Sequence, residues 1–386
     1  MAFLPPTPPK SLLGRHRLLA PSASIRVSPL CLGGMSIGDA WGMIMGDLTK
    51  DKAFELLDAF YDLGGNFIDT ANNYHSGQSE QWIGEWMQKT PGRRSEMVIA
   101  TKYTMSNKGG HPVQQSNFGG TGSKSLHLSI RSSLEALQTD YVDILYVHAW
   151  DYATEIPELM HSLNALVNQG KVLYLGISDA PAWMVTKANM YARQNGLRPF
   201  SVYQGRYSAQ ERDLEREVIP MCREEGMALM PFGVLGGGLF KSPDAIAEEG
   251  GRNVPPPLRV GREEAISKVL DAVAKRHSVP VTSVALAYAL QKSPNVFPIL
   301  GGRKVEHLKA NVEALSLELT PEDVQEIEKG YAFDIGFPHN FMSLTGNMIT
   351  GPHDVNILPS MGHFDYVAPS KAIKAHKGEL TAPWQA

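Results

Sequence analysis

The chain has 386 residues, of which 43% are hydrophobic, and 36 basic residues nearly balance 40 acidic ones. This length allows one large α/β barrel or two ordinary domains, and the formal net charge of −4 gives no electrostatic reason to bind nucleic acid or an anionic membrane. We therefore expect a small-molecule partner. The two cysteines, Cys31 and Cys222, argue against a disulfide framework or a cysteine-based metal site and favour a reducing, cytoplasmic location.

The first 24 residues contain the proline-rich stretch PPTPPK and then PSAS, and show little periodicity. We predict an extended N-terminal arm over residues 1–24. Its composition lacks the apolar region of a secretory signal, and no later stretch approaches the roughly 18 apolar residues of a membrane span. We therefore expect neither secretion nor membrane insertion.

From Ser28 onward, short apolar runs alternate with longer segments of helical period, which indicates repeated βα units. The predicted strands are Pro29–Leu32, Phe67–Asp69, Val98–Thr101, Ile144–His148, Val172–Ile177, Ser201–Gln204, Ala228–Pro231 and Val296–Ile299. The predicted helices are Lys50–Leu63, Ser79–Lys89, Ser125–Gln138, Pro157–Gln169, Ala182–Asn195, Asp213–Glu225, Glu263–His277, Val281–Gln291 and Val305–Leu315. Eight such units close a (β/α)8 TIM barrel, which we place at residues 25–330.

Three long irregular segments interrupt or follow the βα units. Residues 103–124 and 241–261 are predicted loops, and residues 331–386 form a C-terminal extension that we expect to pack on or near the active-site face. Loops of this length in a barrel are more often substrate lids than defects.

Four residues that can hold or move protons lie where predicted strands pass into loops: Asp69, Tyr74, Lys102 and His148. A free phenol has a pKa of about 10, so a tyrosine acid needs a neighbour that stabilises its phenolate. The ammonium of Lys102 could do this, and Asp69 would keep that ammonium charged. His148 would orient a carbonyl oxygen by a hydrogen bond.

Each of these residues also has a structural explanation when taken alone. Asp69 could cap a turn, and Tyr74 could be an ordinary surface residue of a polar loop. Lys102 could be a solvated strand end, and His148 could be a buried polar group with its hydrogen bonds made. Lys102 could also be a Schiff-base nucleophile of an aldolase-type barrel. Complementary titratable groups at the same end of several strands favour a proton-transfer site.

The segments FIDTANNY, ATKYT and YVHAWD resemble the catalytic motifs of the aldo-keto reductases. Within that family, LGISDAPAW, PFGVLGGG and the long C-terminal extension are most similar to fungal aryl-alcohol dehydrogenases and norsolorinic acid reductases. The resemblance implies NADPH-dependent reduction of aryl aldehydes or aromatic, polyketide-like ketones, with Tyr74 as the proton donor. A second possibility is a redox-sensing regulatory subunit with little turnover, because potassium-channel β subunits also resemble this family.

The resemblance implies NADPH as cofactor, bound without a Rossmann domain, and no G-x-G-x-x-G follows a predicted strand here. It places Ser178, Asp179 and Gln204 at the nicotinamide carboxamide, and Gly302 with Arg303 at the 2′-phosphate. Asp179 stands where many members carry asparagine. The full set of implied cofactor contacts is Asp69, Ser178, Asp179, Gln204, Phe232, Gly233, Val234, Leu235, Gly236, Lys241, Gly302, Arg303, His307 and Asn311.

The substrate pocket is expected at Trp41, Tyr74, His148, Ala149 and Trp150. Ala149 follows the predicted catalytic histidine where the family often has a larger aromatic residue. A wider pocket at this point would admit a polycyclic aromatic ketone. The sequence predicts no metal site and leaves the oligomeric state open.

Overall fold

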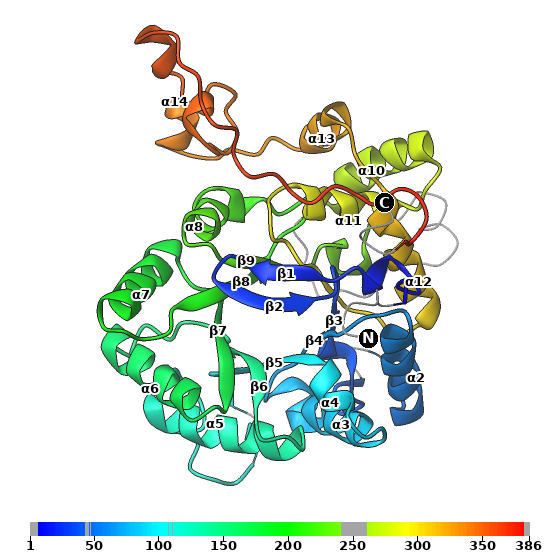
Figure 1. The fold of residues 1–386 in the computed structure, drawn as a ribbon, viewed down its shortest axis with the longest axis vertical. Coiled ribbons are helices and arrows are strands. Elements are labelled where there is room, and N and C mark those ends of the chain that lie inside the picture. Colours follow the sequence, from blue (N-terminus) through cyan, green and yellow to red (C-terminus); the bar gives the residue numbers. More distant parts are fainter. Residues whose placement is uncertain are drawn as a thin grey trace, which may run out of the picture. The chain divides into compact units, whose positions relative to one another are not determined.

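The computed structural model describes residues 7–42, 46, 48–106, 108–109, 111–240 and 261–381. Within them, eight parallel strands form a nearly closed barrel with helices between them, in the order β10-β3-β4-β5-β6-β7-β8-β9 (Figure 1). The strands are β3 (Cys31–Gly33), β4 (Phe67–Asp69), β5 (Val98–Tyr103), β6 (Val142–Val147), β7 (Val172–Ser178), β8 (Phe200–Arg206), β9 (Ala228–Phe232) and β10 (Ile299–Leu300). The predicted (β/α)8 barrel is confirmed.

The central strands show why the sequence favours this fold. Every residue of β5 and β6 is buried. Strands covered on both faces are typical of parallel sheets, because the connecting helices pack outside them and the barrel interior is filled with side chains. The pairing of β5 with β6 sets Lys102 opposite Tyr146, so the register places a charged side chain in the buried interior.

The chain divides into two compact units. The first comprises residues 1–204, 299–312 and 377–386. In Figure 1 its helices lie outside its strands. They are α2 (Lys50–Asp62), α3 (Gln78–Gln88), α4 (Arg93–Glu96), α5 (Ser123–Ala136), α6 (Ile156–Asn168), α7 (Ala182–Gln194) and α12 (Val305–Glu313).

Caps explain several helix boundaries. The Thr49 hydroxyl accepts a hydrogen bond from the backbone N–H of Lys52 and so satisfies a free donor at the start of α2. Gly64 follows the end of the same helix with φ 93°, a left-handed conformation that glycine adopts without a side-chain clash. Its ideal Cβ would lie 2.6 Å from Gly14 Cα, so this close approach requires glycine.

An antiparallel hairpin precedes the barrel, where the sequence predicted an extended arm. It consists of β1 (Arg17–Ala20) and β2 (Ala23–Val27). The side chain of Asn66, just before β4, donates to the Arg26 carbonyl (3.1 Å) and accepts from the Ser28 N–H (2.7 Å). These contacts hold the hairpin beside the N-terminal ends of the strands, the end opposite the βα loops. This apolar run is short and follows a proline-rich segment, so the sequence pattern did not indicate a strand here.

The second unit comprises residues 205–298 and 313–376 and contains β9. Its α-helices are α8 (Val218–Glu224), α10 (Glu263–His277), α11 (Val281–Gln291), α13 (Pro321–Glu328) and α14 (His339–Met342). The single helix predicted over residues 213–225 is instead a 3₁₀ turn, Asp213–Glu215, followed by α8. Pro220 explains the break, because it has no N–H to donate to the preceding turn and is tolerated only near the start of a helix.

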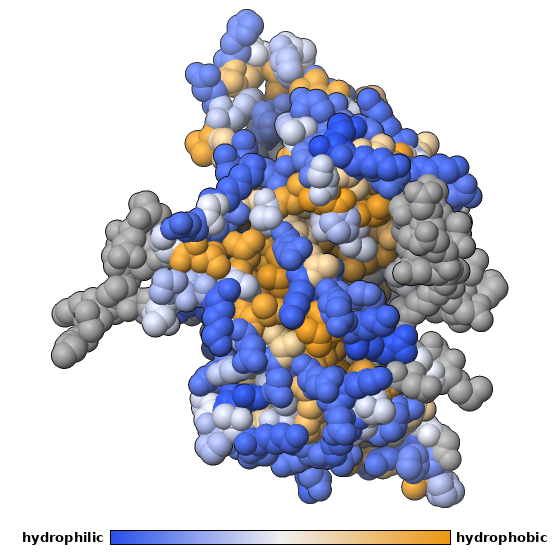
Figure 2. Space-filling view, turned by 90° about the vertical axis from the view of Figure 1, so that its right-hand side faces the viewer, coloured by the Kyte–Doolittle hydropathy of each residue, from blue (hydrophilic) through white to orange (hydrophobic). Residues whose placement is uncertain are grey.

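The described part of the C-terminal extension, residues 331–381, has little regular structure and a small core. Phe337 is 82% exposed and Val367 94% exposed, whereas Ile335 and Met348 are buried. Hydrophobic side chains lie among hydrophilic ones at the top of Figure 2, the part that contains α14. That the extension packs on the active-site face remains a prediction.

Candidate active site

The four predicted proton-transfer residues lie at the ends of neighbouring strands, or in the loops that follow them, in the first unit. Asp69 is the last residue of β4, Lys102 lies near the end of β5, and His148 directly follows β6. Tyr74 begins the short turn Tyr74–Gly77 after β4. Because parallel strands end at the same edge of a sheet, the fold brings these side chains together.

Lys102 is the centre of this cluster, and its ammonium is fully buried. Its Nζ donates to Asp69 Oδ2 (2.5 Å), to the Thr70 carbonyl (2.8 Å) and to Tyr74 Oη (3.2 Å). An ammonium has three N–H donors, so all of them are used. Burial alone lowers the pKa of Lys102, but Asp69 and Tyr74 reverse this and the net pKa is raised. The amine therefore stays charged.

Asp69 makes a strong hydrogen bond through each carboxylate oxygen. Oδ2 accepts from Lys102, and Oδ1 accepts from the Gln204 amide Nε2 at 2.8 Å. The sequence predicted Gln204 as a cofactor contact and missed its bond to Asp69. It also missed the Thr70 carbonyl. A backbone acceptor has no signature in the sequence, and the Gln204 contact spans 135 positions of chain.

The Tyr74 hydroxyl is nearly buried, and its pKa is raised. Burial is the largest cause, the Lys102 ammonium opposes it, and Asp69 adds to the rise. The sequence predicted the opposite net direction, because it counted the cation but not the burial. Since Lys102 donates to the phenol oxygen, the phenol's own proton is free to be donated elsewhere. The hydroxyl is a protonated donor at neutral pH.

His148 lies edge-on to the Tyr74 ring, with the two ring centroids 5.8 Å apart and the planes at 78°. Burial, aided by the Lys102 charge, lowers the pKa of His148 to about 3. The imidazole is therefore neutral at physiological pH. Its Nδ1 is buried and has no hydrogen-bond partner in the part of the chain that the structure describes. A buried polar atom without a partner next to a protonated phenol is suited to a polar ligand.

Three further predicted pocket residues, Trp41, Ala149 and Trp150, are each partly exposed. Trp41 stands edge-on to Tyr74, with ring centroids 6.3 Å apart and an interplanar angle of 68°. Trp150 instead packs against Tyr152, at 6.3 Å between ring centroids. The structure thus brings Trp41 to the phenol and gives Trp150 a different aromatic neighbour.

The implied carboxamide contacts lie at the ends of β7 and β8. Ser178 and Gln204 are buried, whereas Asp179 is exposed and has φ 45°. The Asp179 backbone N–H donates to the Gln204 carbonyl at 3.2 Å, which fixes the turn after β7. A carboxylate at this position can only accept hydrogen bonds, so it fits an amide NH2 but not an amide oxygen.

The implied phosphate segment precedes α12. An ideal Cβ on Gly301 or Gly302 would meet no atom of the described residues within 4 Å, so this part of the chain leaves space beside the backbone. Arg303 and His307 are exposed, whereas Asn311 is buried. The Arg303 guanidinium lies against Gly46, whose added Cβ would be 1.9 Å from Arg303 Nη1. An open helix start with an exposed guanidinium fits an anionic phosphate.

The remaining implied cofactor residues belong to the second unit. Phe232 ends β9, and Gly233 and Gly236 follow with φ 74° and 62°. Val234 is buried and Leu235 is partly exposed. Lys241 lies outside the described residues. Positive φ at both glycines gives a tightly turned backbone that can approach a ligand closely.

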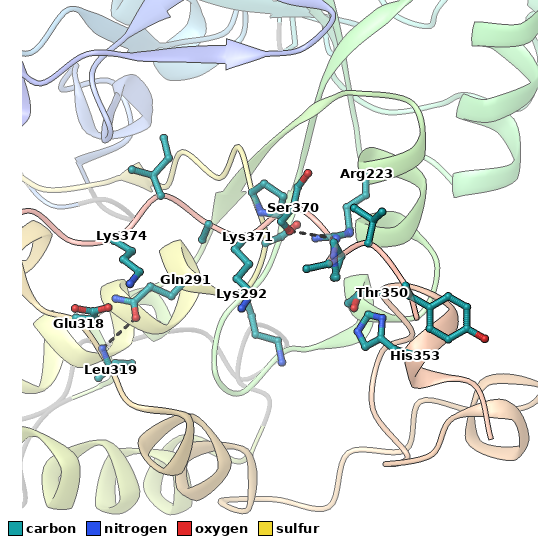
Figure 3. A pocket seen from close by; sticks show the side chains of 18 of the residues that line it. Arg223, Gln291, Lys292, Glu318, Leu319, Thr350, His353, Ser370, Lys371 and Lys374 are labelled. Carbon is teal, nitrogen blue, oxygen red and sulfur yellow. Dashed lines mark hydrogen bonds between the residues drawn. The ribbon is translucent and has the colours of Figure 1, made fainter. Parts of the chain in front are cut away.

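A cavity of about 780 Å³ lies within the second unit, between residues 364–374 and helices α8 and α11 (Figure 3). Arg223, Lys292 and Lys374 are among its lining residues, and Arg223 donates to the Ser370 carbonyl at 3.3 Å. None of the predicted site residues lines it. We assign this cavity no part in proton transfer.

The aldo/keto reductase family profile matches residues 29–332. The chain belongs to this family. It is 81% identical over 383 residues to an aryl-alcohol dehydrogenase of Pestalotiopsis microspora, an alignment that covers 99% of each chain. It is 50% identical to norsolorinic acid reductase B of Dothistroma septosporum, over 93% of this chain and 94% of that protein. The protein is therefore an oxidoreductase, as the sequence predicted.

A third relative is the aldo-keto reductase ausK of Emericella nidulans, which is 51% identical over 88% of this chain and 87% of its own length. Among the described residues of this aldo/keto reductase, no group of three His, Cys, Asp or Glu side chains could hold a metal ion. No helix in the same part of the chain is both long and apolar enough to cross a bilayer.

Proposed function

We propose that this protein is an NADPH-dependent carbonyl reductase that converts aryl aldehydes or aromatic, polyketide-like ketones to alcohols. The observation that carries the proposal is the use of all three Lys102 donors, one of them on Tyr74 Oη. This arrangement leaves the Tyr74 proton for an acceptor and holds a fixed positive charge beside the phenolate that would remain.

The cofactor, when bound, supplies hydride to the carbonyl carbon. Tyr74 donates its proton to the carbonyl oxygen, and Lys102 stabilises the resulting phenolate by hydrogen bond and charge. The neutral imidazole of His148 carries one N–H, which can orient the same oxygen. Asp69 and Gln204 keep the ammonium in place and contribute no atom to the product.

The names of the relatives support the substrate class: one is an aryl-alcohol dehydrogenase and another a norsolorinic acid reductase. The Lys102 ammonium is charged and uses its three N–H groups in hydrogen bonds, which argues against a Schiff-base aldolase, because a nucleophilic amine needs a free lone pair. A screen of NADPH oxidation against aromatic aldehydes, quinones and polyketide ketones tests the proposal. Tightly held cofactor with negligible turnover of every compound would favour the redox-sensing alternative.

Arg303 provides a test of cofactor preference. Replacing Arg303 with serine should raise KM for NADPH roughly 10- to 100-fold, because charged hydrogen bonds to a 2′-phosphate are each worth about 1.5–3 kcal/mol. KM for NADH, which lacks that phosphate, should change less than twofold. The matched control is Lys304→Ser, the exposed neighbouring cation. Equal effects of Arg303→Ser on both cofactors would remove Arg303 from the phosphate site.

Ala149 provides a test of pocket width. Replacing Ala149 with tryptophan should lower kcat/KM for a polycyclic aromatic ketone at least tenfold, because the added ring would fill space that the ketone needs. Turnover of benzaldehyde should change little. Steady-state kinetics with both substrates measure the ratio, and an unchanged preference would mean that residue 149 does not set the width of the pocket.

A further inference from the structure

The segment directly after Tyr74 adopts an unusual backbone conformation. His75 and Ser76 both lie in the left-handed region, with φ 49° and 57°. Side chains other than glycine, asparagine and aspartate rarely adopt this conformation, so surrounding contacts must maintain it. His75 is buried although it follows the predicted acid in a loop. The strained backbone turns its ring toward the loop that follows β3.

The ring of His75 is fastened to that loop at both nitrogens. Nδ1 accepts from the Trp41 backbone N–H at 3.0 Å, so Nε2 carries the proton and donates to the Met35 carbonyl at 3.1 Å. Burial lowers the pKa of His75, although the Met35 bond and the Asp39 charge oppose this, and the ring is neutral. The ring also stacks on the Trp41 indole, at 5.1 Å between centroids and 26° between planes.

Gln78 binds the same loop one helical turn further on. Its Oε1 accepts from the N–H groups of Asp39 (2.7 Å) and Ala40 (3.2 Å), and its Nε2 donates to Asp39 Oδ1 (2.8 Å). Gly38 has φ 138°, and a Cβ there would lie 2.4 Å from His75 Cγ. Glycine at this position therefore allows the loop backbone to lie against the imidazole.

We propose that His75 and Gln78 are positioning residues that hold Trp41 against Tyr74 and thereby determine selectivity for aromatic carbonyl substrates. This inference rests on the proposed reductase function. His75 and Gln78 follow Tyr74 closely in the chain. One short segment therefore carries both the proposed proton donor and the side chains that fix the Trp41 ring beside it. Neither residue touches the reacting atoms. They act through the orientation of the Trp41 ring.

The physical reason is the conformational entropy that a mobile Trp41 side chain would lose when substrate binds. A fixed indole can stack against or pack edge-on to an aromatic substrate without first being ordered, whereas a mobile one must lose rotamer freedom on binding. A small aliphatic aldehyde gains little from the indole in either case. We call the contacts of His75 and Gln78 with the loop that carries Trp41 the clamp. Loss of the clamp should therefore raise KM for aromatic substrates selectively and leave proton donation by Tyr74 intact.

The decisive variant is His75→Gly, because glycine accepts φ 49° without strain while removing both hydrogen bonds and the stacked ring. We expect KM for 2-naphthaldehyde to rise roughly 3- to 10-fold, with kcat for propanal changed less than twofold and the pH profile unmoved. The matched control is His75→Asn. Asparagine tolerates this backbone conformation and its Oδ1 can replace Nδ1 as the acceptor for the Trp41 N–H, so most of the selectivity should return.

A second measurement does not depend on turnover. The near-UV circular dichroism of Trp41, obtained as the difference between wild type and Trp41→Phe, should be largely lost in His75→Gly and kept in His75→Asn. If wild type reduced no carbonyl, the proposed function would fail while this signal still tested the clamp. Should His75→Gly not fold, Gln78→Met removes the other half of the clamp at a partly exposed position. A Trp41 signal and an aromatic KM that survive either variant would overturn the inference.

Discussion

Replacing Tyr74 with phenylalanine should lower kcat for carbonyl reduction by roughly 10²- to 10⁴-fold, the usual contribution of a general acid. The substitution removes only the hydroxyl, so the ring can keep its edge-on contacts with Trp41 and His148. The affinity for NADPH should change little, because no implied cofactor contact is lost. Fluorescence titration of NADPH and stopped-flow measurement of hydride transfer separate the two effects. Near-native turnover in this variant would mean that another group supplies the proton.

The matched control is Tyr141→Phe, at a phenol whose ring lies under the Arg94 guanidinium near the start of β6. We expect it to leave kcat within twofold of wild type. Comparable losses in the two variants would indicate general damage to the barrel and not the removal of an acid.

The pH dependence of the reduction rate is a second test of Tyr74 as the proton donor. Reduction requires the protonated phenol, and the pKa of Tyr74 is raised above its ordinary value. The rate should therefore be flat through neutral pH and fall only as pH rises through that elevated pKa. Glu80 offers a contrast, because burial raises its pKa to about 7. A fall in kcat/KM centred near pH 7 would direct attention to Glu80 or another carboxyl group instead of Tyr74.

The strands and helices could be predicted from the sequence where hydrophobic periodicity was clear. Residues Phe67–Asp69 and Glu263–His277 have the predicted bounds. Asp69, Lys102 and His148 lie at or directly after strand ends, as predicted, and parallel strands bring these ends to one edge. The helix at residues 213–225 was wrong because Pro220 interrupts it. The hairpin at residues 17–27 was missed because a proline-rich lead precedes a very short apolar run.

The contacts between the residues of the site were harder to predict from the sequence than the identity of those residues. The Thr70 carbonyl that binds Lys102 is a backbone group, and any residue there could supply it. The role of His75 depends on a backbone conformation that histidine rarely adopts, so residue type gave no signal. The direction of the Tyr74 pKa shift depends on how deeply the fold buries the hydroxyl, which residue order alone does not reveal.

Replacing Lys102 with methionine should have the largest combined effect on stability and activity. Methionine fills much of the lysine volume but leaves the Asp69 carboxylate buried, and among the described side chains Gln204 is the partner that remains. Breaking a buried ion pair by removing one charge typically costs about 3–5 kcal/mol. The free energy of unfolding, measured with urea, should fall by about that amount. Reduction should fall at least 100-fold, because the phenolate loses its cation.

The double variant Lys102→Met with Asp69→Asn separates the two roles of the lysine. Asparagine keeps the shape of Asp69 and removes the uncompensated charge, so most of the lost stability should return. Activity should not return, because the cation beside Tyr74 is still missing. A double variant that regained both would show that Lys102 serves only to balance Asp69. One that regained neither would mean that the ammonium holds the loop after β4 in place through the Thr70 carbonyl.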